Sequence, residues 1–291
     1  RLFAQIRPEV VVVTGGYAGA AAGIAAGLMD IPLVLQEQNS YPGAVTRLLT
    51  RFAVRVHVAY PEAIRLLPAA ASRCVVSGNP VRERSTMGRA EARRSLGLPE
   101  DVTLTFVTGG SQGSLALNRG VTSYVEGVSR GDVLRPELLH VLWATGRKHF
   151  DSVQAALDAI GTLEWVHPLP YIEDMPGALA ASDFALCRSG AMTTAELLNE
   201  GLPAILVPLP TAAEDHQTCN ARALEAAGAA RVLPESEMTA ERLGAELFTM
   251  VRSRTELEQM RTNALERARP DATGIIASDL VTMLSPERRA A

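Results

Sequence analysis

The sequence predicts an α/β fold with doubly wound parallel sheets. Along its 291 residues, short runs rich in Val, Ile and Leu alternate with longer helical stretches. These runs are continuously apolar, which is typical of strands that crossover helices cover on both faces. At about 100–200 residues per domain, the length favours two domains. We therefore expect two doubly wound domains, each with a core of its own.

The apolar runs give the expected strands in chain order. They lie at residues 10–13, 33–36, 54–59, 74–77, 104–108, 139–144, 184–187, 204–207 and 230–233. A charge-dense stretch at 82–101 interrupts the pattern, as a domain boundary does. We place an incomplete first domain at 1–83, a second at 84–272, and a C-terminal helix and tail at 273–291, with a return of that helix to the first domain as one option.

Composition excludes several classes of protein. The net charge is −4 and the 28 Lys and Arg residues are spread along the chain, so nucleic-acid binding finds no support. Every apolar stretch is shorter than the roughly 20 residues of a membrane-spanning helix, which leaves only a peripheral membrane contact open. The 3 cysteines are far apart and lack the Cys/His spacing of zinc sites. We expect no metal and no cofactor.

A glycine-rich loop follows the strand expected at 104–108 and opens a helix. Glycines let a backbone approach an anion closely, and the N–H groups and dipole at a helix amino end favour phosphate. Tight packing explains such a turn equally well when the turn is taken alone. The loop consists of Thr108, Gly109, Gly110, Ser111, Gln112, Gly113 and Ser114.

Two later loops also place polar groups near the start of a helix. Glu196 lies about two turns beyond the loop that follows the strand at 184–187, where its carboxylate can accept hydrogen bonds from both hydroxyls of a ribose. A solvated Glu on a helix face is the alternative. After the next strand, Asp215, His216 and Gln217 cluster as a sugar-hydroxyl site requires, although Asp215 can simply cap the helix.

The first half has comparable loops. Backbone amides that follow its first strand could face a diphosphate, and they belong to Gly15, Gly16 and Tyr17. Polar residues follow later strands of this half: Glu37, Asn39 and Arg82.

Taken together and in this order, these stretches resemble the MurG family of peptidoglycan N-acetylglucosaminyltransferases over residues 7–280. The motifs are Arg7-Pro8-Glu9-Val10, Gly15-Gly16-Tyr17, Glu37-Gln38-Asn39, Gly78-Asn79-Pro80-Val81-Arg82, Gly109-Gly110-Ser111-Gln112-Gly113, Tyr171-Ile172-Glu173-Asp174-Met175, Arg188-Ser189-Gly190-Ala191 and Asp215-His216-Gln217. The resemblance implies a GT-B architecture, in which two Rossmann-like domains enclose the active site in a cleft.

The resemblance also implies a reaction. N-acetylglucosamine would pass, with inversion, from UDP-N-acetylglucosamine to the C4 hydroxyl of muramoyl-pentapeptide on a polyprenyl diphosphate (lipid I), giving lipid II. No Asp-x-Asp motif is present to place a metal at the diphosphate. The protein would lie peripherally at the cytoplasmic side of the plasma membrane. Its partners would be UDP-N-acetylglucosamine, lipid I at the membrane surface and, as a further option, other cell-wall synthesis proteins.

The implied site residues follow from the matched motifs. By similarity, the backbone of Ile172 meets the uracil, Met175 lies beside it, and Glu196 holds the ribose hydroxyls. The diphosphate is taken by two loops and an arginine, namely Arg82, Ser111, Gln112, Gly113, Ala191, Met192 and Thr193. Sugar hydroxyls are met by Asn39 and Gln217, and the acceptor by Gly15, Gly16 and Tyr17.

The catalytic base is where the sequence departs from the family. The family carries its usual candidate histidine in an N-terminal Gly-Gly-Thr-Gly-Gly-His loop, which the chain lacks. We therefore expect an N-terminally truncated chain, and we assign the base to none of its 5 histidines. Glu37 is the candidate for an assisting catalytic role near the acceptor. We expect this chain to bind UDP-sugar weakly and to turn over poorly or not at all.

Two rival functions stay open. One is a GT-B glycosyltransferase with another acceptor, such as a diacylglycerol or an aglycone. The other is a non-catalytic UDP-sugar-binding subunit that a partner chain completes. A dehydrogenase is disfavoured, because no G-x-G-x-x-G motif follows a strand with an acidic residue about 20 positions later.

Overall fold

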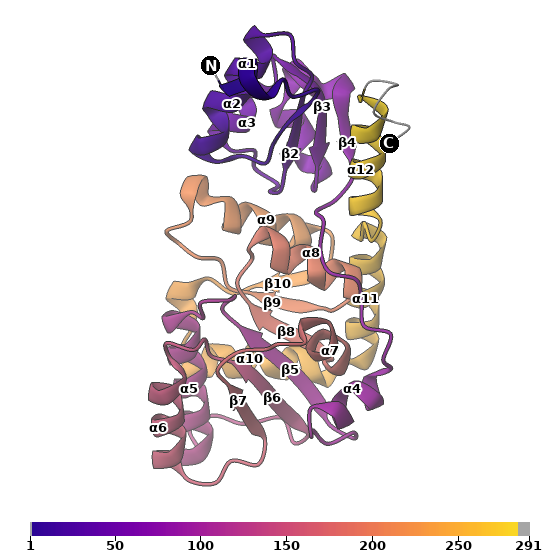
Figure 1. Ribbon diagram of the computed structural model, residues 1–291. Helices are drawn as coiled ribbons and strands as arrows, with labels where there is room; N and C mark the ends of the chain where they lie inside the picture. The colour runs from indigo at the N-terminus through magenta and orange to yellow at the C-terminus, as the bar shows by residue number, and fades with distance from the viewer. Residues whose placement is uncertain (1, 285–291) are drawn as a thin grey trace. The chain divides into compact units, whose positions relative to one another are not determined.

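The computed structural model describes residues 2–284 and divides into two compact units, and Figure 1 labels most of their helices and strands. The first unit contains the described residues up to Val81, the segment Ala212–Asn220 and the described residues from Arg269 on. The second contains Arg82–Thr211 and Ala221–Ala268. No helix among the described residues is both long and apolar enough to cross a membrane.

The first unit is built on a four-stranded parallel sheet in the order β1-β2-β3-β4. All five residues of β2 are buried, as a strand covered on both faces requires. The strands are β1 (Val11–Val13), β2 (Leu33–Glu37), β3 (Ala53–Val58) and β4 (Cys74–Val76). The helices are α1 (Leu2–Ile6), α2 (Gly16–Leu28), α3 (Ala44–Leu49), α12 (Ala272–Thr282) and the 3-10 helices η1 (Pro61–Leu66), η2 (Pro68–Arg73) and η3 (Ala213–Asp215).

Close packing explains why α2 is rich in small residues. A Cβ at Gly23 would collide with the side chain of Leu49, so the glycine lets α2 approach that residue closely. The C-terminal helix α12 joins the same unit through charge, since Asp279 pairs with Arg55 of β3 at 2.7 Å and lies 3.2 Å from the buried His57.

The second unit is built on a six-stranded parallel sheet in the order β10-β9-β8-β5-β6-β7. Its strands are β5 (Thr103–Thr108), β6 (Leu139–Ala144), β7 (Val166–Leu169), β8 (Phe184–Cys187), β9 (Ala204–Leu206) and β10 (Ala230–Val232). Its helices are α4 (Arg89–Ser95), α5 (Leu115–Arg130), α6 (Phe150–Ile160), α7 (Met175–Ala181), α8 (Ala191–Glu200), α10 (Ala240–Arg252), α11 (Arg254–Arg267) and the 3-10 helix η4 (Glu235–Glu237). Helix α9 (His216–Ala226) begins in the first unit and ends in the second.

The strand order creates a switch point between β5 and β8. The chain runs outward from β5 through β6 to β7, then returns to the other side of β5 as β8 and continues outward through β9 to β10. Connections on the two sides of β5 therefore diverge, which opens a crevice at the carboxyl ends of β5 and β8. The predicted class of α/β fold with two parallel sheets is confirmed.

One strand of the second sheet was not predicted. β7 contains His167 and Pro168, which break the apolar run that marks the other strands. Pro168 lacks a backbone N–H and is tolerated because β7 pairs only with β6, at the edge of the sheet.

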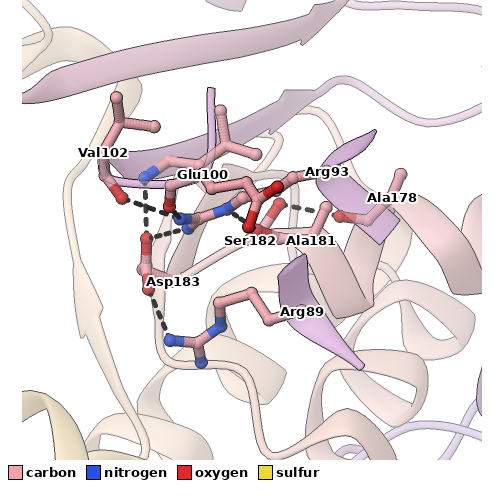
Figure 2. Close-up of polar contacts among 9 residues, drawn as sticks. Arg89, Arg93, Glu100, Val102, Ala178, Ala181, Ser182 and Asp183 are labelled. Carbon is pink, nitrogen blue, oxygen red and sulfur yellow. Dashed lines mark hydrogen bonds and ion pairs between the residues drawn. The ribbon is translucent and has the colours of Figure 1, made fainter. Parts of the chain in front are cut away.

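A buried ion-pair network ties α4 to the amino ends of β5 and β8, as Figure 2 shows. Asp183 accepts hydrogen bonds from Arg93 at 2.7 Å, from Arg89 at 2.8 Å and from the backbone N–H of Leu104 at 2.7 Å. Arg93 is 4% exposed and also donates to the backbone carbonyls of Ala181, Glu100 and Val102. The network lies at the opposite end of the strands from the crevice, so it stabilises the sheet and leaves the crevice free.

Candidate functional site

A cavity of about 310 Å³ opens at the carboxyl ends of the central strands of the second unit. The strand register explains one wall. Phe106 of β5 pairs with Ala185 of β8, and Thr108 pairs with Cys187, so their side chains point to the same face. The lining residues are Arg82, Phe106, Thr108, Gly110, Ser111, Ala144, Tyr171, Ile172, Met175, Leu179, Ala185, Cys187, Met192, Thr193, Glu196 and Leu197.

The strand wall is apolar and chemically inert. Complete burial raises the pKa of the Cys187 thiol to about 12, so the thiol stays neutral.

The opposing side of the cavity comes from α7 and the loop before it. Asp174 caps α7 by accepting a hydrogen bond from the backbone N–H of Gly177 at 3.0 Å, and this fixes the turn that presents Ile172 and Met175. The guanidinium of Arg147 lies 4.9 Å from the centre of the Tyr171 ring. Together with the strand wall, these side chains form an apolar slot that suits a planar heterocyclic base.

Glu196 places a carboxylate in this cavity from α8. Burial raises the pKa of the Glu196 carboxyl above its ordinary value, and the Arg82 guanidinium, 4.0 Å away, lowers it in part. A half-buried carboxylate beside an apolar slot can accept two hydrogen bonds from a vicinal diol. The residue is therefore placed as recognition of a ribose requires.

The glycine-rich loop is held by backbone packing against the loop that follows β6. A Cβ at Gly113 would collide with the carbonyl oxygen of Thr145, and its φ of +73° lies in the region that favours glycine. Ser114 ends the loop and caps α5, since its Oγ accepts from the backbone N–H of Leu117 at 3.3 Å. Only glycine fits at position 113, so the loop reaches the cavity in one fixed conformation.

Two helix amino ends thus meet the cavity. Gly110 and Ser111 line it just before α5, while Met192 and Thr193 line it in the first turn of α8. The cap position of α8 is Gly190, whose lack of a side chain leaves the helix dipole open to a ligand. The dipole at a helix amino end favours negatively charged ligands such as phosphate. With Arg82 at the edge, the cavity offers sites for a base, a ribose and a diphosphate.

The predicted donor residues divide between the two units. Seven of them line the cavity: Arg82, Ser111, Ile172, Met175, Met192, Thr193 and Glu196. Gln112, Gly113 and Ala191 flank it, in the glycine-rich loop and as the first residue of α8. Asn39 and Gln217 belong to the first unit, so their roles stay predictions.

Glu37 in the first unit is engaged by its own loop. One carboxylate oxygen accepts from the backbone N–H of Asn39 at 3.0 Å, and the other accepts from the backbone N–H of Gly43 at 3.1 Å. Asn39 in turn accepts from Asn220 at 3.0 Å, and Asn220 also accepts from the backbone N–H of Ser40 at 2.8 Å. Glu37 is 4% exposed, so this geometry fits an organiser of the loop better than a proton acceptor.

The residues predicted to meet the acceptor begin α2. Gly15 and Gly16 have φ values of +91° and +72°, and no other atom comes within 4 Å of where a Cβ would lie on either. Tyr17 follows and is 89% exposed. Gln217 lies in the first turn of α9, two residues after Asp215, and both Glu214 and Asp215 adopt positive φ. A contact of Gly15, Gly16 and Tyr17 with the acceptor stays a prediction.

Several wall residues were not predicted. Phe106, Ala185, Cys187 and Leu179 were passed over because apolar residues in strands and helices resemble ordinary core. The signal that identifies the strand residues is their two-residue spacing toward each strand's carboxyl end, which places alternate side chains on the face that carries the site. Within residues 2–284, no three His, Cys, Asp or Glu side chains gather as a metal site would require.

Comparison with known proteins identifies relatives of both halves of the chain. The Glycosyltransferase family 28 C-terminal domain matches residues 104–274, and the corresponding N-terminal domain matches residues 1–58. The UDP-N-acetylglucosamine--N-acetylmuramyl-(pentapeptide) pyrophosphoryl-undecaprenol N-acetylglucosamine transferase of Salinibacter ruber is 41% identical over 285 residues, which cover 97% of this chain and 74% of that protein. The protein of the same name from Alkalilimnicola ehrlichii is 41% identical over 271 residues, which cover 93% of this chain and 72% of that protein.

A solved structure agrees with these relatives. The crystal structure of Acinetobacter baumannii MurG superposes with a TM-score of 0.78 at 30% sequence identity, covering 97% of this chain and 77% of that one. Sequence, domain matches and structure therefore agree that the chain belongs to glycosyltransferase family 28, within the MurG family.

Proposed function

We propose that the chain transfers N-acetylglucosamine from UDP-N-acetylglucosamine to the C4 hydroxyl of the muramoyl-pentapeptide of lipid I, with inversion, to give lipid II. The observation that carries this proposal is the cavity of the second unit, where an apolar slot, the Glu196 carboxylate and two helix amino ends provide for a nucleoside diphosphate. Membership of the MurG family supports the choice of sugar and acceptor.

The donor binds along the cavity from base to diphosphate. The uracil lies in the slot beside Ile172 and Met175, and the Glu196 carboxylate accepts hydrogen bonds from the ribose hydroxyls. The diphosphate lies against the amino ends of α5 and α8, with the exposed Arg82 guanidinium on its open side. Contact of Gln217 and Asn39 with the sugar hydroxyls is proposed from the family resemblance alone, since both residues belong to the first unit.

The same groups promote the chemistry. Cleavage of the bond between the sugar and UDP builds negative charge on the diphosphate, and fixed backbone dipoles and Arg82 stabilise that charge without reorganising. These donors interact with the leaving group more strongly as the charge develops, so they lower the barrier as well as bind the substrate.

The acceptor hydroxyl must lose a proton during the transfer. Both oxygens of Glu37 accept backbone hydrogen bonds, so we propose that Glu37 shapes the loop at 38–43 and affects the acceptor through that loop. We assign proton acceptance to no residue of the chain.

Lipid I is held in a membrane, so we propose that the protein works peripherally at the cytoplasmic side of the plasma membrane. Other cell-wall synthesis proteins remain proposed partners.

The test is a transfer assay with UDP-[14C]GlcNAc and a lipid I analogue, with the product identified by mass spectrometry. Formation of the disaccharide supports the proposal, and transfer to a diacylglycerol or an aglycone in its place contradicts the assigned acceptor. Binding of UDP-N-acetylglucosamine without transfer to any acceptor favours the non-catalytic subunit. The expectation that this chain turns over poorly is checked by the rate in the same assay.

A further inference from the structure

Arg188 is a buried arginine behind the donor cavity that has so far been given no role. It follows β8 directly and is 8% exposed. One of its terminal nitrogens donates to the carbonyl oxygens of Val207 at 3.1 Å and Pro208 at 3.0 Å. The other donates to Ser114 Oγ at 2.8 Å and to the carboxylate of Glu235. Arg188 itself does not line the cavity.

Arg188 and these partners come from the loops that follow four strands. Arg188 follows β8, Ser114 ends the glycine-rich loop after β5, Val207 and Pro208 follow β9, and Glu235 follows β10. Because ligands of a doubly wound sheet bind at these carboxyl ends, a residue that joins four such loops sets the geometry of the site.

Ser114 is the link from Arg188 to the diphosphate. Its Oγ accepts from Arg188 and from the backbone N–H of Leu117, so one atom both caps α5 and anchors the loop end. Gly113, directly before it, is already fixed against Thr145. The end of the loop is thus held by Arg188 on one side and by the Thr145 backbone on the other.

The charge of Arg188 is satisfied within this cluster. Glu235 neutralises it, which leaves little net charge to attract a phosphate. Four acceptors around a flat guanidinium match the fork geometry of arginine, whereas a lysine ammonium has three donors on a single atom and cannot span them.

We propose that Arg188 is a positioning residue for the donor diphosphate. It holds the glycine-rich loop and the start of α5 in register with the loop that opens α8, and it does so without touching the nucleotide. This inference rests on the proposed donor site. Its specific consequence is that loss of Arg188 weakens the contribution of the diphosphate to binding and leaves recognition of uracil and ribose intact.

The experiment compares the dissociation constants of uridine and UDP by calorimetry. In the wild type, the ratio of the two dissociation constants measures how much the diphosphate contributes to affinity. We expect Arg188→Ala to weaken UDP at least tenfold while the uridine constant stays within twofold, and Arg188→Lys to restore only part of the loss. Arg231→Ala is the control, since it breaks a more exposed arginine–glutamate pair, with Glu246 at 2.6 Å, and Arg231 lies within β10 rather than in the loops that Arg188 joins. We expect it to leave the ratio unchanged.

Ser114→Ala provides a second route if Arg188→Ala does not fold. It removes the link to the loop while the other bonds of Arg188 remain. Thr239→Ala is its control, because Thr239 caps α10 in the same way at 3.2 Å. If Ser114→Ala lowers the ratio of the uridine and UDP dissociation constants and Thr239→Ala does not, the result supports the positioning role of Arg188.

Three results overturn the inference. If the variants weaken the binding of uridine and UDP equally, the effect of Arg188 is a general structural one. If the Arg188 and Ser114 variants bind UDP as the wild type does, Arg188 has no positioning role, and the proposed donor site is unaffected. A wild-type chain that binds neither ligand would remove the donor site itself, so failure of the proposed function is distinguishable from failure of the role of Arg188.

Discussion

The Glu196 carboxylate lies 4.0 Å from the guanidinium of Arg82 in the wall of the proposed donor cavity. Burial raises the pKa of the carboxyl, and the arginine opposes this only in part because its side chain is 60% exposed. Burial thus destabilises the charged form of Glu196, and hydrogen bonds from a bound ribose would offset this effect.

Glu196→Gln should weaken uridine and UDP alike, by about 10- to 100-fold, since hydrogen bonds to a charged group contribute roughly 1.5–3 kcal/mol. The ligand-free protein should become more thermally stable, because at neutral pH the folded state carries the cost of a buried charge that glutamine lacks. Calorimetry and thermal unfolding check the two effects. Unchanged nucleoside affinity would remove Glu196 from the ribose site.

Uridine affinity should fall on acidification. The ribose needs the charged carboxylate, and because the folded pKa of Glu196 is raised, protonation begins at a higher pH than for an ordinary Glu. Arg82→Gln removes the opposing charge, so the fall should begin at a still higher pH. Uridine is the ligand of choice because it has no phosphate that titrates, and Glu196→Gln is the control that should lack this pH dependence.

Gly113→Ala should weaken UDP at least about tenfold, because the added methyl meets a backbone carbonyl that cannot move cheaply and the residue has a positive φ. Gly88→Ala is the matched variant, at the cap of α4 and outside the residues that line the cavity. Its φ is −71°, and no other atom comes within 4 Å of where the Cβ would lie, so UDP affinity should stay within about twofold. Equal effects of the two substitutions would show that the fixed loop conformation does not matter.

Asp183→Ala should lower the free energy of unfolding by about 3–5 kcal/mol, because Arg93 is left as an uncompensated buried charge. Urea unfolding measures the loss, and the affinity of the folded protein for UDP should not change. Arg94→Ala, which breaks an exposed pair with Glu100, should lower the free energy of unfolding far less, because solvent screens exposed charges. A comparable loss in both variants would show that burial does not set the value of the Asp183 network.

The sequence predicted the parts of the site that depend on local pattern. A continuous apolar run followed by glycines gave β5 and its loop, and the place of Glu196 in a helix after β8 followed in the same way. These features can be predicted because buried strands require apolar residues and the starts of helices favour particular residue types. β7 was not predicted because its histidine and proline interrupt the apolar run, which is permitted in an edge strand.

Features that depend on tertiary contacts could not be predicted. Arg188 is one arginine among many in the sequence, and only the fold shows that it bonds to three other loops. The motif predicts an assisting catalytic role for Glu37, and only the fold shows that two backbone N–H groups donate to its carboxylate. Such roles depend on tertiary contacts, and a single sequence does not show which residues come into contact.

The central claim is that the second unit carries a UDP-sugar site, and titration of the chain with UDP-N-acetylglucosamine in a calorimeter tests it most directly. We expect saturable one-to-one binding that Glu196→Gln weakens by about 10-fold or more. The absence of heat at millimolar ligand, or wild-type affinity in the Glu196→Gln variant, would contradict the account.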